Sequence, residues 1–89
     1  MISHQTPQYI ASAIRAARGA LSWSQVELAA HSGVSTPTIA RIEACLISPK
    51  METVSKIFRA LEEGGVYFAW TAPGVYTMNA SLVKRKTAR

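Results

Sequence analysis

The sequence predicts a mainly α-helical fold of four to five helices followed by a β-hairpin, and three observations lead to this prediction. Residues 24–43 carry the signals of two short helices that are separated by a glycine-containing turn. Apolar residues recur at helical spacing on both sides of that stretch. After Gly64 and Gly65 the pattern changes to two runs of strand-forming residues. We therefore expect a helical domain over residues 1–63, a hairpin over 64–80 and a basic flexible tail over 81–89.

The first expected helix opens at Pro7, because proline suits a first helical position where no N–H is needed. Thr6 would cap this helix. Its apolar positions mark one buried stripe: Ile10, Ala13, Ile14, Ala17 and Leu21. Arg15 lies off the stripe, and two interpretations stay open for it, a phosphate contact or a solvated side chain.

The two short helices are predicted from their caps. Ser24 and Glu27 fit a capping box, in which each side chain bonds the backbone N–H of the other residue. Gly33 suits the left-handed conformation with which a helix commonly ends. Ser35 then caps the second helix, and Pro37 occupies its first turn. Two short helices joined by a tight turn are typical of a helix-turn-helix, whose second helix reads DNA.

The second short helix has an apolar side and a polar side. Val34, Ile39 and Ile42 form the inner edge, which leaves the other positions to face outward. The outward residues are Thr36, Thr38 and Arg41.

Together these blocks resemble the Cro/CI-type helix-turn-helix regulators, often called the XRE family, over residues 10–61. The matching residues are Ser24, Gln25, Leu28, Ala29, Gly33, Val34, Ser35, the run Ile-Ala-Arg-Ile-Glu over 39–43, Pro49, Thr53, Val54 and Leu61. The resemblance implies a lambda-repressor-like fold that binds double-stranded DNA. The alternative is a helical bundle that uses the same caps only for stability, but caps alone do not require Thr-x-Thr-x-x-Arg on the outer face.

The resemblance also implies roles for individual residues. Gln25 would fix a phosphate with help from the helix N-terminus. Thr36, Pro37 and Arg41 would meet base edges, and Arg41 would bond guanine in two-pronged fashion, worth about 1–3 kcal/mol of discrimination. The alternative is that Arg41 reaches only a phosphate, in which case its loss would weaken all sequences alike. The full implied DNA-binding set is Gln25, Ser35, Thr36, Pro37, Thr38, Arg41 and Lys50. Arg18 and Glu43 would form a two-pronged, partly buried ion pair with a structural role.

After Glu43 the chain departs from the family pattern. Cys45 stands where glycine usually turns the chain, at a cost of about 1 kcal/mol if the left-handed region is used. Leu46 and Ile47 replace residues that normally help to hold phosphate. We expect these two side chains to pack on a neighbouring element, and a protein-binding surface is the alternative.

Pro49 is expected to open the last helix, whose core stripe is Val54, Ile57, Phe58 and Leu61. In the hairpin that follows, residues 66–70 and 74–78 would be the strands and residues 71–74 the turn. Two strands alone are marginal in water and their edges invite pairing, so we expect a homodimer. The expected dimerisation residues are Val66, Tyr67, Phe68, Trp70, Val75 and Tyr76. The alternative is a hairpin that folds onto its own helices.

Composition limits the other functions. The net charge is +5, but Lys84, Arg85, Lys86 and Arg89 lie in the last six residues, so the charge alone does not indicate a nucleic-acid partner. The sequence has no Asp and two distant histidines, so we expect no enzyme, no metal site and no cofactor. A single cysteine, with no signal peptide and no long apolar run, favours the cytoplasm and no membrane.

The sequence therefore predicts a bacterial or phage-like transcription regulator. It would act as a homodimer on an inverted-repeat operator, by default as a repressor that can be autoregulatory. The alternative is a protein-binding module of antitoxin or antiactivator type, which would grip a protein partner through the hairpin or through Leu46 and Ile47.

Overall fold

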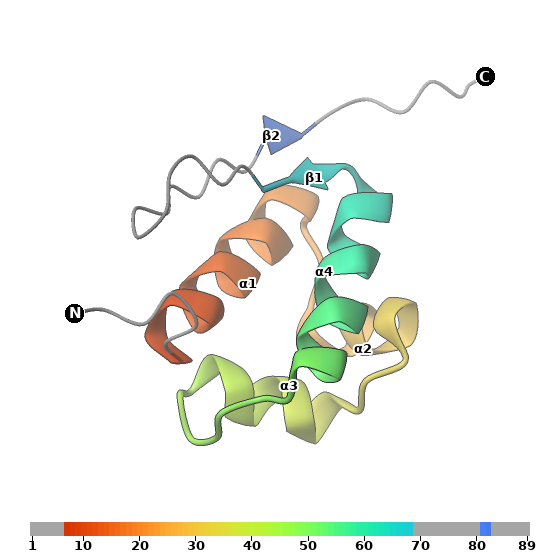
Figure 1. The fold of residues 1–89 in the computed structure, drawn as a ribbon. Helices are drawn as coiled ribbons and strands as arrows, with labels where there is room; N and C mark the ends of the chain where they lie inside the picture. Colours follow the sequence, from red (N-terminus) through yellow and green to blue (C-terminus); the bar gives the residue numbers. More distant parts are fainter. Residues whose placement is uncertain (1–6, 69–80, 83–89) are drawn as a thin grey trace.

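The computed structural model of the chain describes residues 7–68 and 81–82. Within these residues there are four helices, α1 (Pro7–Leu21), α2 (Gln25–Ser32), α3 (Thr36–Glu43) and α4 (Met51–Gly64), and two short strands, β1 (Val66–Tyr67) and β2 (Ser81–Leu82). Figure 1 shows α3 across the lower end of the domain and the two strands across its upper end. The predicted mainly helical fold is confirmed. Thr6, the expected cap of α1, lies outside the described residues.

The core forms where the apolar stripes of the four helices meet. Its largest fully buried side chains are Ile14, Leu28, Ile39, Ile42, Ile57, Leu61 and Val66. Each helix supplies at least one of them, and Val66 comes from β1. Burial of such side chains stabilises the fold by about 1.5–3 kcal/mol each. The periodic stripes read from the sequence thus face one common interior.

The caps of α2 and α3 set the boundaries of the helix-turn-helix. Ser24 accepts the Glu27 N–H at 3.0 Å, and a Glu27 carboxylate oxygen accepts the Ser24 N–H at 2.7 Å. Gly33 ends α2 with a left-handed φ of 79°. Ser35 precedes α3 with an extended backbone and accepts the Thr38 N–H at 3.3 Å. These contacts form the turn that directs α3 across the end of the domain.

The start of α4 differs from the expectation that Pro49 opens it. Lys50 is the N-cap, with an extended backbone at φ −70° and ψ 154°, and the helix begins at Met51. An N-cap residue lies outside helical φ and ψ, so Pro49 falls before the helix.

At its other end α4 approaches the α1–α2 connection closely. A Cβ added to Gly64 would lie 2.9 Å from both Leu21 Cδ1 and Trp23 Cη2. The Trp23 indole stacks in turn on the His31 ring, with centroids 4.0 Å apart. Gly64 is therefore the residue that permits this contact.

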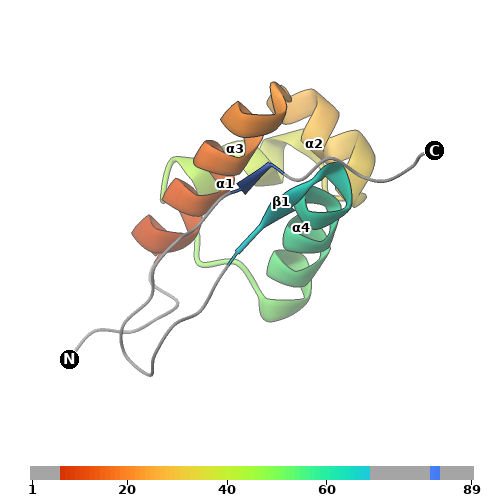
Figure 2. The same ribbon diagram turned by 90° about the horizontal axis from the view of Figure 1, so that it is seen from above.

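The strands pair in antiparallel fashion, with Val66 opposite Leu82 and Tyr67 opposite Ser81. Assigning residues 81 and 82 to a flexible tail was therefore wrong, because strand pairing depends on backbone N–H and C=O groups, which the apolar pattern does not reveal. The expected second strand at 74–78 and the turn before it lie outside the described residues. Figure 2 shows β1 lying across α1 and α4, with α3 beneath them.

The structure corrects part of the expected dimerisation surface. Val66 is fully buried in the core of its own domain, and Phe68 stacks on Phe58 of α4 with ring centroids 4.7 Å apart. Only Tyr67 between them is exposed, because successive strand residues face opposite sides. The Val66 side chain is therefore not available to a second copy, which corrects that part of the expected surface, and β1 packs on its own helices. A dimerisation role for Tyr67 and Phe68 stays a prediction. Trp70, Val75 and Tyr76 lie outside the described residues.

Candidate nucleic-acid interface

The inner face of α3 is buried against the core, so the outer face of the helix points to solvent. Ile39 and Ile42 are 0% and 1% exposed, and they fix α3 against the core. Arg41 and Pro37 are exposed, while Thr36 is half-buried. The structure thus places the predicted base-reading residues on the side of α3 that points away from the interior.

Ser35 and Thr38 contact each other at the start of α3. The Ser35 hydroxyl donates to Thr38 Oγ1 at 2.9 Å while it accepts the Thr38 N–H. Both hydroxyls therefore belong to the cap, and capping is a role that the structure shows for these two residues. Their predicted DNA contacts stay predictions.

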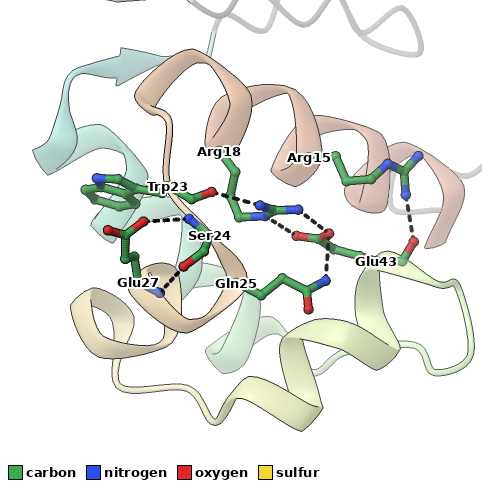
Figure 3. A network of polar contacts seen from close by, with 7 residues as sticks. All are labelled: Arg15, Arg18, Trp23, Ser24, Gln25, Glu27 and Glu43. Atoms are coloured by element: carbon green, nitrogen blue, oxygen red, sulfur yellow. Dashed lines mark hydrogen bonds and ion pairs between the residues drawn. The ribbon is translucent and has the colours of Figure 1, made fainter.

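α3 is anchored at its other end by an ion pair with α1. Arg18 Nε donates to Glu43 Oε2 at 2.7 Å, and Arg18 Nη2 donates to Glu43 Oε1 at 2.9 Å (Figure 3). The Glu43 residue is only 7% exposed. This is the two-pronged pair that the family resemblance implies.

Both members of the pair stay charged. The hydrogen bond to Glu43 raises the pKa of Arg18, and this effect exceeds the opposing effect of burial. Burial alone would raise the pKa of Glu43, but hydrogen bonds from Arg18 and Gln25, with the nearby arginine charges, lower it. Arg18 Nη1 also donates to the Trp23 carbonyl oxygen at 2.8 Å, which ties the pair to the start of the helix-turn-helix.

Gln25 also contacts Glu43 in the structure. Its Nε2 donates to Glu43 Oε1 at 3.1 Å, so the amide links the start of α2 to the end of α3 (Figure 3). The phosphate contact that the resemblance implies stays a prediction. A DNA phosphate would have to share the Gln25 amide with the Glu43 carboxylate, which already accepts a hydrogen bond from it.

Arg15 has a partner that sequence reasoning did not find. Its Nη1 donates to the backbone carbonyl oxygen of Glu43 at 2.6 Å (Figure 3). Sequence analysis left two interpretations open for this side chain, a phosphate contact or a solvated position. One signal was available: Arg15 and Arg18 are three residues apart, and such residues lie on the same face of a helix.

The loop that follows α3, residues 44–50, places Cys45 in the left-handed region that sequence analysis considered, and it overturns the expectation for Leu46 and Ile47. Cys45 adopts the left-handed region with a φ of 61°, at the position where the family usually has glycine. Leu46 is 72% exposed and Ile47 is 37% exposed, so the expectation that they pack on a neighbour was wrong. The Cys45 and Leu46 N–H groups donate to the Ile42 and Arg41 carbonyls, so the chain turns back at the end of α3 and the Leu46 side chain is left in solvent. Lys50 is exposed at the start of α4.

This fold and this surface define a helix-turn-helix domain of the DNA-binding class. A model of the family described as "Helix-turn-helix" matches residues 14–68, more than half of the chain. The chain therefore belongs to the Cro/CI-type (XRE) helix-turn-helix family, which is a family of DNA-binding regulators and not of enzymes. In a comparison with curated protein sequences, none matches the chain. Across residues 7–68, no helix has the length and apolar character needed to cross a membrane.

Proposed function

We propose that this DNA-binding regulator is a sequence-specific repressor that acts as a homodimer on an inverted-repeat operator. The observation that carries the proposal is the exposure of Arg41 on a helix whose opposite side is almost fully buried. A helix held in this way can enter the major groove with its outer side chains directed at base edges. Repression follows if the bound protein occludes polymerase, and the compartment that we propose for it is the bacterial cytoplasm.

Each outer residue of α3 has a proposed task. Arg41 donates two hydrogen bonds to guanine O6 and N7, the commonest specific contact in the major groove. Thr36, Pro37 and Thr38 offer apolar contacts to thymine methyl groups. Lys50 and the start of α2 at Gln25 contact phosphates, which position the domain but carry no sequence information.

The homodimer is supported by the described strands. Tyr67 is 52% exposed, and among the described residues β1 pairs with β2 alone, which leaves an outer edge of this sheet that can pair with another copy. The strands lie at the end of the domain opposite α3 (Figure 1), so pairing there leaves α3 accessible. In such a dimer the two recognition helices would lie about one helical turn of DNA apart, roughly 34 Å.

A second function, a protein-binding module of antitoxin or antiactivator type, is favoured by a different observation. Leu46 is 72% exposed within the loop that normally helps to hold phosphate in this family, and Met51, directly after that loop, is 61% exposed. Exposed apolar side chains at such a place suit an apolar protein surface. A stable stoichiometric complex with another protein, together with no affinity for DNA, would favour this module over the repressor.

A footprint of the purified protein on the DNA upstream of its own gene tests the proposed repressor. We expect protection of two related half-sites whose centres are about one helical turn apart. The affinity should fall steeply as salt increases, because phosphate contacts release counterions. Protection of no sequence, or equal binding of every duplex, contradicts the proposal. Arg59→Ala, on the exposed surface of α4, is the matched control for an Arg41→Ala variant.

A further inference from the structure

Two arginines of α1 hold the same residue at the end of the recognition helix. Arg18 binds the Glu43 carboxylate through two nitrogens, and Arg15 binds the Glu43 backbone carbonyl oxygen at 2.6 Å. Figure 3 shows the two side chains leaving α1 side by side toward Glu43. Glu43 is thus fixed at both its side chain and its main chain.

The backbone contact completes the end of α3. The last carbonyl groups of a helix have no partner within the helix. Here Ala44 N–H donates to the Ala40 carbonyl, Cys45 N–H to that of Ile42 and Leu46 N–H to that of Arg41, at 3.0, 3.0 and 2.9 Å. The last two bonds form a Schellman motif, which closes the helix around the left-handed residue.

The carbonyl of Glu43 is the next acceptor in this series, and a side chain from another helix supplies its partner. The guanidinium of Arg15 also brings a positive charge to the negative end of the α3 dipole, where a cation is favourable. The turn of α3 that carries Arg41 is therefore held against α1 by a contact that does not involve Arg41 itself.

We infer that Arg15 is a positioning residue for DNA reading. It fixes the position of the last turn of α3 relative to α1, and hence the place where Arg41 contacts a base. This inference rests on the proposed DNA-reading role of α3. A two-pronged contact from Arg41 to guanine requires a fixed donor geometry. Removing Arg15 loosens that geometry and lowers the affinity for the operator more than the affinity for unrelated DNA.

The competing role is a direct phosphate contact from Arg15, and the two roles differ in their salt dependence. Loss of one phosphate contact makes the negative slope of log K against log salt less steep by about 0.9, and it weakens binding to all sequences alike. Loss of a positioning contact leaves the salt slope unchanged and lowers the ratio of operator affinity to non-specific affinity.

The test compares the wild type with Arg15→Met, Arg15→Lys and the surface control Arg59→Met. Binding is measured on the footprinted operator and on a scrambled duplex of equal length, at several salt concentrations. Urea unfolding of each variant, at the temperature of the binding measurements, verifies that all of the variants are folded there. Hydrogen exchange of the Cys45 and Leu46 amides reports directly on the end of α3.

For Arg15→Met we expect about a tenfold loss of operator affinity, the size of one charge-assisted hydrogen bond. The scrambled duplex should lose much less, the salt slope should match the wild type, and the Cys45 and Leu46 amides should exchange faster. Arg15→Lys keeps the charge but not the planar fork, so it should recover only part of the loss. Arg59→Met should behave as the wild type.

Three results overturn the inference. The first is unchanged operator affinity in Arg15→Met. The second is a salt slope that is less steep by about 0.9 while the ratio of operator affinity to non-specific affinity is unchanged, which assigns Arg15 to a phosphate contact. The third is full recovery by Arg15→Lys. If the wild type itself binds no DNA selectively, the proposed function fails and this inference fails with it, whereas a selective wild type with an indifferent Arg15→Met variant refutes only the inference.

Discussion

Replacing Arg18 by Met should destabilise the domain strongly, because it leaves the buried Glu43 carboxylate without its cation. Methionine preserves much of the aliphatic length of Arg18 but removes both donors to Glu43 and the donor to the Trp23 carbonyl. Breaking a buried ion pair by removing one partner costs about 3–5 kcal/mol. The Arg18 side chain is 20% exposed and that of Glu43 is 5% exposed. Solvent therefore screens the pair in part, and we expect the lower end, about 3 kcal/mol.

Such a loss is large for a small domain. At about 4–8 °C for each kcal/mol, a 3 kcal/mol loss lowers the Tm by roughly 12–24 °C. Urea unfolding followed by circular dichroism measures the free energy directly, with Arg59→Met on the surface of α4 as the control. The double variant Arg18→Met/Glu43→Leu should recover most of the loss, because it removes both charges.

A cost below about 1 kcal/mol for Arg18→Met would refute this reasoning, since that is the value of a solvent-exposed pair. A double variant that is less stable than Arg18→Met would also refute this reasoning. If the unpaired Glu43 carboxylate is what destabilises Arg18→Met, removing that carboxylate should restore stability.

Three further predictions concern Gly64, Cys45 and the titration of Glu43. Gly64→Ala should cost about 1–2 kcal/mol in urea unfolding, because its Cβ would lie 2.9 Å from the Trp23 ring, whereas Gly19→Ala, with no atom within 4 Å, should stabilise α1 by up to about 1 kcal/mol. Equal effects of the two alanines would contradict the close contact. Cys45→Gly should raise the free energy of unfolding by up to about 1 kcal/mol, because glycine adopts a φ of 61° without strain, and a loss of stability would show that the Cys45 side chain contributes more than its backbone costs. The lowered pKa of Glu43 makes stability depend on acid: its contribution is complete above the ordinary value of 4.5 and is lost as the pH falls through the lowered pKa. Urea unfolding between neutral pH and about pH 3 should therefore show a steeper acid loss for the wild type than for Glu43→Gln, and parallel curves would exclude a stabilising Glu43 carboxylate.

The parts of the fold that the sequence predicted well depend on local chemistry. The Ser24–Glu27 capping box and the left-handed Gly33 require only residues that are close together in the chain. The apolar stripes likewise depend on helical spacing alone. The Arg18–Glu43 pair joins residues far apart in the sequence, so only the family resemblance made it predictable.

The contacts that were missed depend on how elements pack. Arg15 reaches the Glu43 carbonyl because of the way α1 crosses the end of α3, and no sequence pattern marks a backbone acceptor. Strand alternation gives opposite faces to Val66 and Tyr67, but it does not tell which face meets the helices. The exposure of Leu46 is decided by the direction in which the loop leaves α3.

Selection of duplexes from a random pool, run in parallel with the wild type and with Arg41→Ala, measures directly whether the outer face of α3 reads bases. We predict that the wild type enriches an inverted repeat with a guanine at one fixed position of each half-site. The variant should lose the preference at that position alone and keep the rest of the motif. No enrichment by the wild type, or the same motif from both proteins, would contradict DNA reading by Arg41.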